Sequence, residues 1–343
     1  MAFSPIWQPG GAAAPASPAA TRQIVTGAAH RLQAAIAEAA RRTDDWQDQR
    51  LGYALIDSAL SNCLAQLATT GHWGRENLLP SDELWKIAGE VLQTGELQNR
   101  ARTKPLGYAG DFQLLADIVD DRCGDHPLGR LFDRYFLNQA APQAVRNRTV
   151  QGAFALADHV AQQKRHVYRI ASVGVGTGMD VQMGVSMLPA EVRTRVEATL
   201  IDLDAAGLQF AKNRLLEVIG ENQINATREN LFRITQTNRN QVVPADTDFL
   251  ICSGLFDYLE DNVATAMLKL FWDSLADGGL LLVGNFVPYH PTRAYMEWIG
   301  NWYLQYRTPV QLSAMAAAAG IPDPRRMVLA ERTGADLFLR CEK

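Results

Sequence analysis

The sequence predicts an α/β fold: a doubly wound, Rossmann-like sheet with a terminal antiparallel hairpin, preceded by a helical N-terminal domain. Hydrophobic residues recur at helical spacing up to about residue 160. After Arg165, buried-strand runs alternate with helical stretches, and a glycine-rich turn follows the first run. Such alternation forms a parallel sheet with helices on both faces.

The N-terminal part is predicted to be helical. Residues 1–20 carry no charged side chain and are rich in Ala, Pro and Gly, so we expect a flexible tail. Residues 21–160 form the predicted helical domain, which opens with two long amphipathic helices between Thr21 and Thr70. Pro80-Ser81-Asp82 predicts the N-terminal cap of a later helix that ends at Gly95.

The remaining residues, 161–343, form the predicted sheet domain. Its strands are expected at 167–173, 198–202, 248–253 and 280–286, with helices at 205–220 and 262–276. Residues 326–331 and 335–341 flank Thr333-Gly334 and predict a hairpin at the sheet edge. A substrate-binding insert is expected at about 287–320.

Composition excludes several classes of protein. The 343 residues include 33 Lys and Arg against 37 Asp and Glu, a net charge of −4, so no basic field favours nucleic acid. The four cysteines lie far apart and show no disulfide framework or metal-binding spacing, so we expect no metal and a reducing cytoplasm. No run of about 18 apolar residues predicts a membrane span, and no signal peptide is expected.

The glycine-rich turn has the spacing GxGxG. Gly174, Gly176 and Gly178 follow a predicted strand and open a helix, where backbone amides can face a nucleotide-type ligand. Met179 stands where the dinucleotide fingerprint has its third glycine, which disfavours NAD. Asp202, at the end of the next strand, lies where an acid accepts hydrogen bonds from a ribose. The alternatives are a simple tight turn and a helix cap at Asp202.

A second loop, Ser253 to Leu259, follows another strand at the same sheet edge. Asp257 in this loop either balances positive charge and positions substrate, or caps the helix that starts near Asp261.

These motifs resemble those of class I S-adenosylmethionine-dependent methyltransferases over about residues 165–343. The resemblance implies that Gly174, Gly176 and Gly178 wrap the methionine moiety and that Asp202 holds the ribose. The other cofactor-binding residues assigned through it are Leu203, Asn238 (near the adenine), Ser253, Gly254 and Leu255. S-adenosyl-L-methionine is therefore the expected cofactor.

Four strings resemble, more specifically, the bacterial extracellular-factor (3-hydroxypalmitic acid methyl ester) biosynthesis methyltransferases. They are Lys104-Pro105-Leu106-Gly107-Tyr108-Ala109-Gly110-Asp111-Phe112, Ala144-Val145-Arg146-Asn147-Arg148, Gly254-Leu255-Phe256-Asp257-Tyr258-Leu259 and Asn285-Phe286. This likeness implies a helical cap over the cofactor and a methyl ester made from a fatty acid. Tyr108 would then close on the cofactor, with a catalytic role, and Arg148 would pair with its carboxylate; both could instead be structural.

Aromatic and basic residues gather after the strand 280–286. The expected substrate-binding residues are Tyr289, His290, Arg293, Trp298, Trp302, Tyr306 and Arg307. His290 can bind or deprotonate an acidic nucleophile. Trp298, Trp302 and Tyr306 also recur at helical spacing, so the alternative is a helix that packs an aromatic stripe on the sheet.

We therefore predict a methyltransferase that acts on a small-molecule or fatty-acid-like substrate by carboxyl O-methylation, giving a methyl ester. N- or S-methylation of a small metabolite is the main alternative. A nicotinamide-dependent oxidoreductase and a non-enzymatic binding module are rivals from other classes. Met179 disfavours the first, and the combination of the glycines, Asp202 and the second loop disfavours the second.

Overall fold

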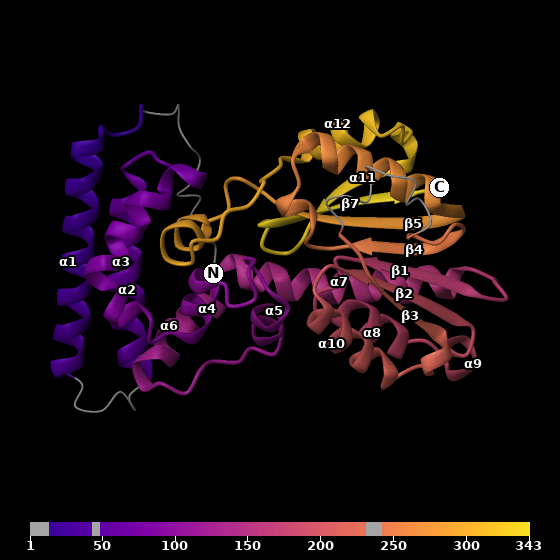
Figure 1. The fold of residues 1–343 in the computed structure, drawn as a ribbon, viewed down its shortest axis with the longest axis horizontal. Coiled ribbons are helices and arrows are strands. Elements are labelled where there is room, and N and C mark those ends of the chain that lie inside the picture. The colour runs from indigo at the N-terminus through magenta and orange to yellow at the C-terminus, as the bar shows by residue number, and fades with distance from the viewer. Residues whose placement is uncertain (1–13, 43–48, 231–241) are drawn as a thin grey trace. The chain divides into compact units, whose positions relative to one another are not determined.

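The computed structural model describes residues 14–42, 49–230 and 242–343, which form two compact units (Figure 1). The first unit comprises the chain up to Gln143 together with Tyr289–Leu304. The second comprises Ala144–Pro288 and Gln305–Lys343. The second unit thus begins earlier than the expected boundary near residue 160, and part of the expected substrate insert folds with the helices.

The first unit is helical, and its described residues contain no strand, as predicted. Its helices are α1 (Pro18–Arg42), α2 (Gln49–Ala68), α3 (Leu78–Leu92), α4 (Glu96–Thr103), α5 (Phe112–Val119) and α6 (Pro127–Leu137). The two long amphipathic helices are confirmed, with Ala28, Leu32 and Ile36 buried along one face of α1. Most of the predicted tail lies outside the described residues, but its end at residue 20 is wrong. A helix tolerates Pro18 in its first turn, and alanine favours helix thereafter.

The predicted cap at Pro80-Ser81-Asp82 is wrong, because α3 already begins at Leu78. Pro80 falls in the first turn, where its missing N–H has no helical partner to lose. The Ser81 hydroxyl instead donates a hydrogen bond of 2.8 Å to the carbonyl oxygen of Trp298, within the same unit.

The second unit is built on a seven-stranded sheet in the order β3-β2-β1-β4-β5-β7-β6. The strands are β1 (Tyr168–Val173), β2 (Val196–Asp202), β3 (Ile224–Arg228), β4 (Thr247–Cys252), β5 (Leu275–Phe286), β6 (Arg326–Ala330) and β7 (Asp336–Glu342). The first five are parallel, while β7 is antiparallel to both β5 and β6. The doubly wound sheet and the terminal hairpin are therefore confirmed; β3 was not predicted.

Helices cover both faces of this sheet (Figure 1). One face packs against α7 (Ala140–Gln162), α8 (Met179–Ser186) and α10 (Ala205–Leu216), with the short α9 (Ala190–Arg193) nearby; the other packs against α11 (Asp261–Ser274) and α12 (Pro309–Ala318). The α7 helix packs closely on the sheet at Gly152. A Cβ on this residue would stand only 2.7 Å from the Ile251 Cδ1 atom of β4.

Candidate active site

The glycine-rich turn lies where the strand order reverses, between β1 and β4, at the carboxyl ends of the strands. Gly174, Gly176 and Gly178 have φ angles of +64°, +53° and +63°, a region that other residues rarely adopt. Gly178 also has no room for a side chain, since a Cβ there would stand 2.7 Å from the Cβ of Ala211. The turn thus presents bare backbone at the point where open α/β sheets bind ligands.

Asp202 ends β2 beside this turn. Its Oδ2 accepts a hydrogen bond from the Gly176 amide (3.1 Å) and its Oδ1 accepts one from the Asp204 amide (3.0 Å). Burial raises the pKa of Asp202. Asp204, not Asp202, caps α10, so the cap interpretation of Asp202 is wrong. Leu203 is 43% exposed beside it, and Asn238 lies outside the described residues.

The loop after β4 is the third part of the site. Gly284 of β5 passes so close that a Cβ on it would stand 2.2 Å from the Ser253 carbonyl oxygen. The Ser253 hydroxyl lies 3.5 Å from the Asp180 Oδ2 atom, at the start of α8. A Cβ on Gly254 would stand 3.0 Å from the Arg148 Nη2 atom, so Arg148 lies directly against this loop. Leu255 follows, and its carbonyl accepts a hydrogen bond from the Tyr258 amide.

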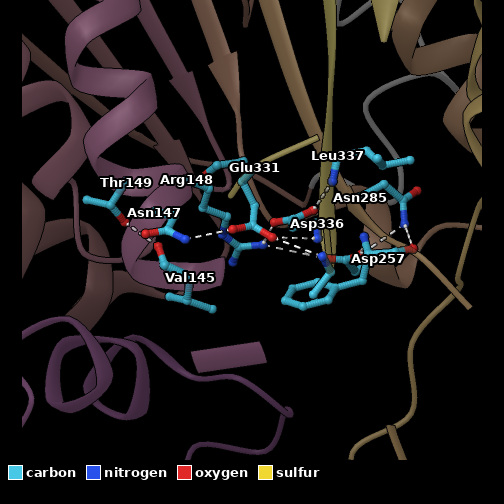
Figure 2. Close-up of polar contacts among 12 residues, drawn as sticks. Val145, Asn147, Arg148, Thr149, Asp257, Asn285, Glu331, Asp336 and Leu337 are labelled. Atoms are coloured by element: carbon cyan, nitrogen blue, oxygen red, sulfur yellow. Dashed lines mark hydrogen bonds and ion pairs between the residues drawn. The ribbon is translucent and has the colours of Figure 1, made fainter. Parts of the chain in front are cut away.

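Arg148 is the centre of a buried charge cluster (Figure 2). Its Nη1 donates to the Asp336 Oδ2 atom at 3.0 Å and lies 3.6 Å from the Asp257 Oδ2 atom. Burial, and then the charge of Asp336, raise the pKa of Asp257 to about 8. Burial raises the pKa of Asp336 to about 6, against the lowering effect of Arg148. One arginine is therefore shared by two carboxyl groups.

Asp257 ties the loop after β4 to the end of β5. It lies in the short helix η4 (Phe256–Tyr258), and its Oδ1 accepts hydrogen bonds from the Asn285 side chain (2.9 Å) and the Phe286 amide (2.8 Å). The alternative that Asp257 caps α11 is wrong, since the residue at that position is Glu260 and no side chain caps the helix. Asp257 therefore holds the loop in place.

Asn285 also accepts a hydrogen bond from Arg307, whose guanidinium is fully engaged. Arg307 donates from Nη1 to Asn285 and to the Phe256 carbonyl, and from Nη2 to the Leu259 carbonyl. Both Nε and Nη2 donate to the Asp261 Oδ1 atom. All five N–H groups of an arginine are then occupied, which leaves none for a substrate anion. We therefore do not retain Arg307 as a substrate-binding residue.

Sequence reasoning missed the roles of Asp180, Asn285 and Asp336. Asn285 is fully buried near the end of β5. The sequence could have indicated its role, because a polar amide at the end of an apolar strand needs hydrogen-bond partners when it is buried. Asp336 and Asp180 could not be placed from sequence. Asp336 reaches Arg148 through the pairing of β7 with β5, and Asp180 interacts electrostatically with Arg148 because α7 and α8 pack on the same face of the sheet.

Several predicted substrate residues belong to the helical unit. His290 is 4% exposed, and burial, followed by the charge of Arg293, lowers its pKa to about 3. Arg293 donates to the Glu297 Oε1 atom at 2.7 Å and lies over the ring of Trp73. Trp298 is fully buried, and Tyr289 is 45% exposed.

The expected helical stripe of Trp298, Trp302 and Tyr306 is wrong. The one helical turn here is a π-helix, η5 (Tyr295–Ile299), and the chain is irregular from Asn301 to Arg307. Asn301 has a φ of +49°, which ends the helix. Trp302 is buried in the helical unit, whereas Tyr306 belongs to the sheet unit.

The segment around Tyr108 is a turn followed by a helix cap. Gly107 and Gly110 have positive φ angles, and Asp111 caps α5 by accepting from the Gln113 and Leu114 amides. The glycines and the acid of this unusual string thus have local structural roles. Tyr108 itself is 38% exposed, and its role toward the cofactor stays a prediction.

The described residues contain no cluster of His, Cys, Asp or Glu that could hold a metal ion. Over the same ranges, every helix is too short or too polar to cross a membrane.

Comparisons with known proteins agree with the fold. A possible exported protein from Bordetella parapertussis aligns with a TM-score of 0.59 and 18% identity, covering 95% of this chain and 99% of its own. The CurJ carbon methyltransferase aligns with a TM-score of 0.51 and 13% identity, covering 95% and 93%. No curated protein matches significantly. A family model described as "Putative methyltransferase" matches residues 113–321, more than half of the chain. The chain therefore belongs to this methyltransferase family.

Proposed function

We propose that the protein transfers a methyl group from S-adenosylmethionine to a carboxylate of a small, fatty-acid-like molecule. The observation that carries the cofactor assignment is the hydrogen bond between the Gly176 amide and the Asp202 carboxylate, which joins the glycine turn and the acidic residue in one site. When bound, the cofactor supplies an electrophilic methyl group on a sulfonium sulfur.

The residues present fit this cofactor. Gly174, Gly176 and Gly178 hold the turn at positive φ angles and leave its backbone bare of side chains, and Asp202 offers carboxylate oxygens for the ribose hydroxyls. Arg148 makes its hydrogen bond and ion pairs through Nη1, and within the described ranges Nη2 keeps its donors beside Gly254. An arginine in this position can pair with the carboxylate of the methionine moiety.

The choice of a carboxylate acceptor rests on the family resemblance. A carboxylate is already ionised at neutral pH and needs no general base. N- or S-methylation, the alternative, would demand a general base for a protonated nucleophile.

The test is methyl transfer from methyl-labelled S-adenosylmethionine to carboxylic acids of increasing chain length, with the matching amines and thiols as controls. Methyl esters release volatile label as methanol in alkali, whereas N- and S-methyl products do not. We expect alkali-volatile label with the acids. Stable label on an amine or a thiol would replace the carboxylate proposal while leaving the cofactor assignment intact.

A further inference from the structure

The helical unit contains a partly buried positive charge, that of Lys104. Among the described residues, Lys104 forms no ion pair; its Nζ donates one hydrogen bond, of 2.8 Å, to the Asn301 carbonyl oxygen. Burial, and then the charge of Arg102, lower the pKa of Lys104. Two neighbouring cations that are half withdrawn from water repel each other, and an anion between them would relieve that repulsion.

The surrounding acids are already neutralised. Glu297 is completely buried and accepts from Arg293, from the Gly74 amide and from the Asn77 side chain. Asp82 accepts from Arg102 at 2.6 Å. The charge of Lys104 is therefore the excess charge of this cluster.

Unpartnered polar atoms lie beside the same residues. The Tyr303 hydroxyl is buried and has no hydrogen-bond partner among the described residues, and neither does the Asn301 Oδ1 atom. Tyr303 interacts electrostatically with both Glu297 and Arg102. Buried hydroxyls without a partner are rare, since each costs about 1 to 3 kcal/mol.

The backbone at this point is strained. Lys104 and Asn301, which share one hydrogen bond, have φ angles of +48° and +49°, although neither is glycine. A left-handed conformation costs energy for a residue with a side chain, and here it is adopted by the C-cap of α4, Lys104, and by an asparagine, which tolerates it better than most residues.

We propose that Lys104, Arg102 and Tyr303 form a binding site for a small organic oxyanion, either a carboxylate or a phosphate ester. Lys104 has two ammonium protons left, and Arg102 keeps its Nε–H after bonding to Ser81 and Asp82. The Tyr303 hydroxyl supplies a third donor. All three residues lie in the helical unit, and binding of an anion to them can be tested without the proposed cofactor.

The experiment is calorimetry of the full chain, without cofactor, using octanoate, octyl phosphate and octanol as probes. We expect at least one of the two anions to bind and octanol not to bind. The anion that binds more tightly shows whether the site prefers a carboxylate or a phosphate ester. Lys104→Met and Tyr303→Phe should each weaken anion binding about tenfold or more. The control Lys86→Met removes an exposed lysine of the same unit, whose partner is Glu83, and should change nothing.

Tyr303→Phe removes a hydroxyl that has no hydrogen-bond partner in the part of the chain that the structure describes, so the thermal midpoint of this variant should equal or exceed that of the wild type. If Lys104→Met fails to fold, Tyr303→Phe alone decides. Wild-type protein that binds neither anion, or equal anion affinity in wild type and Tyr303→Phe, would overturn the site. Binding of S-adenosylhomocysteine is measured in a separate titration and tests only the proposed function. A failure of the anion site can therefore be told apart from a failure of the proposed function.

Discussion

At the scale of single residues, Asp202 connects the glycine turn to β2, and we propose that it contacts the ribose. Asp202→Ala should weaken S-adenosylmethionine binding by about 1.5 to 3 kcal/mol, roughly tenfold to more than a hundredfold, because it removes a charged acceptor of two hydroxyls. Calorimetry measures the affinity, and circular dichroism confirms that the variant folds. Unchanged affinity in a folded variant would show that Asp202 does not contact the ribose.

Asp257 makes a pH-dependent prediction. Its pKa is raised from 3.8 to about 8, so between these values the folded chain holds a proton that the unfolded chain has released. The free energy of unfolding should therefore fall as the pH rises through this range. Asp336, Arg148 and Arg307 carry the charges that act on Asp257, so they influence how steeply the stability changes with pH.

Asp257→Asn cannot titrate and retains an acceptor for Asn285 and the Phe286 amide. Denaturant unfolding at about pH 5 and at about pH 8 should show a smaller loss of stability for this variant than for the wild type. Parallel pH profiles for the two proteins would contradict the raised pKa.

At the scale of elements, the terminal hairpin fixes the site through one ion pair. Asp336 at the start of β7 holds Arg148 of α7. Asp336→Ala should destabilise the fold by about 3 to 5 kcal/mol, because it leaves a buried guanidinium undercompensated. The control Asp273→Ala breaks an exposed pair with Lys269 and should cost under about 0.5 kcal/mol. If Asp336→Ala and Asp273→Ala reduced the free energy of unfolding in urea equally, the hairpin would not stabilise the site through Asp336.

The start of α8 depends on Gly178 for two reasons, and a matched glycine separates them. Gly178→Ala and Gly334→Ala both place alanine at a positive φ, which costs about 1 to 2 kcal/mol. Only Gly178 meets a neighbour, Ala211, at 2.7 Å, whereas Gly334 has nothing within 4 Å. Denaturant unfolding should show a further loss of about 1 to 3 kcal/mol for Gly178→Ala. Equal losses of stability for Gly178→Ala and Gly334→Ala would mean that α8 and α10 move apart at little cost to make room for the added methyl group.

Local patterns predicted the elements that local physics determines. Periodicity revealed α1 and α2, and apolar runs revealed β1, β2, β4 and β5. The start of α3 was missed because a serine and an aspartate after a proline look like a cap, although Ser81 bonds to Trp298 across the unit. Tertiary contacts override local propensity at such positions.

At the scale of the whole molecule, the chain crosses between its two units more often than the sequence suggests. Residues 289–304 leave the sheet unit after β5 and pack with the helices through Glu297 and Tyr295, and the chain then returns at Gln305. Such a return depends on contacts between distant segments, so composition could only indicate an insert. For the same reason sequence could not separate the engaged Arg307 from residues that keep donors for a ligand.

We propose that the glycine turn and Asp202 bind S-adenosylmethionine and not a nicotinamide dinucleotide. Calorimetric titration of the full chain with S-adenosylhomocysteine and, separately, with NADH tests this directly. We expect saturable binding of S-adenosylhomocysteine at about one molecule per chain, with no binding of NADH. Saturable binding of NADH without binding of S-adenosylhomocysteine would contradict it.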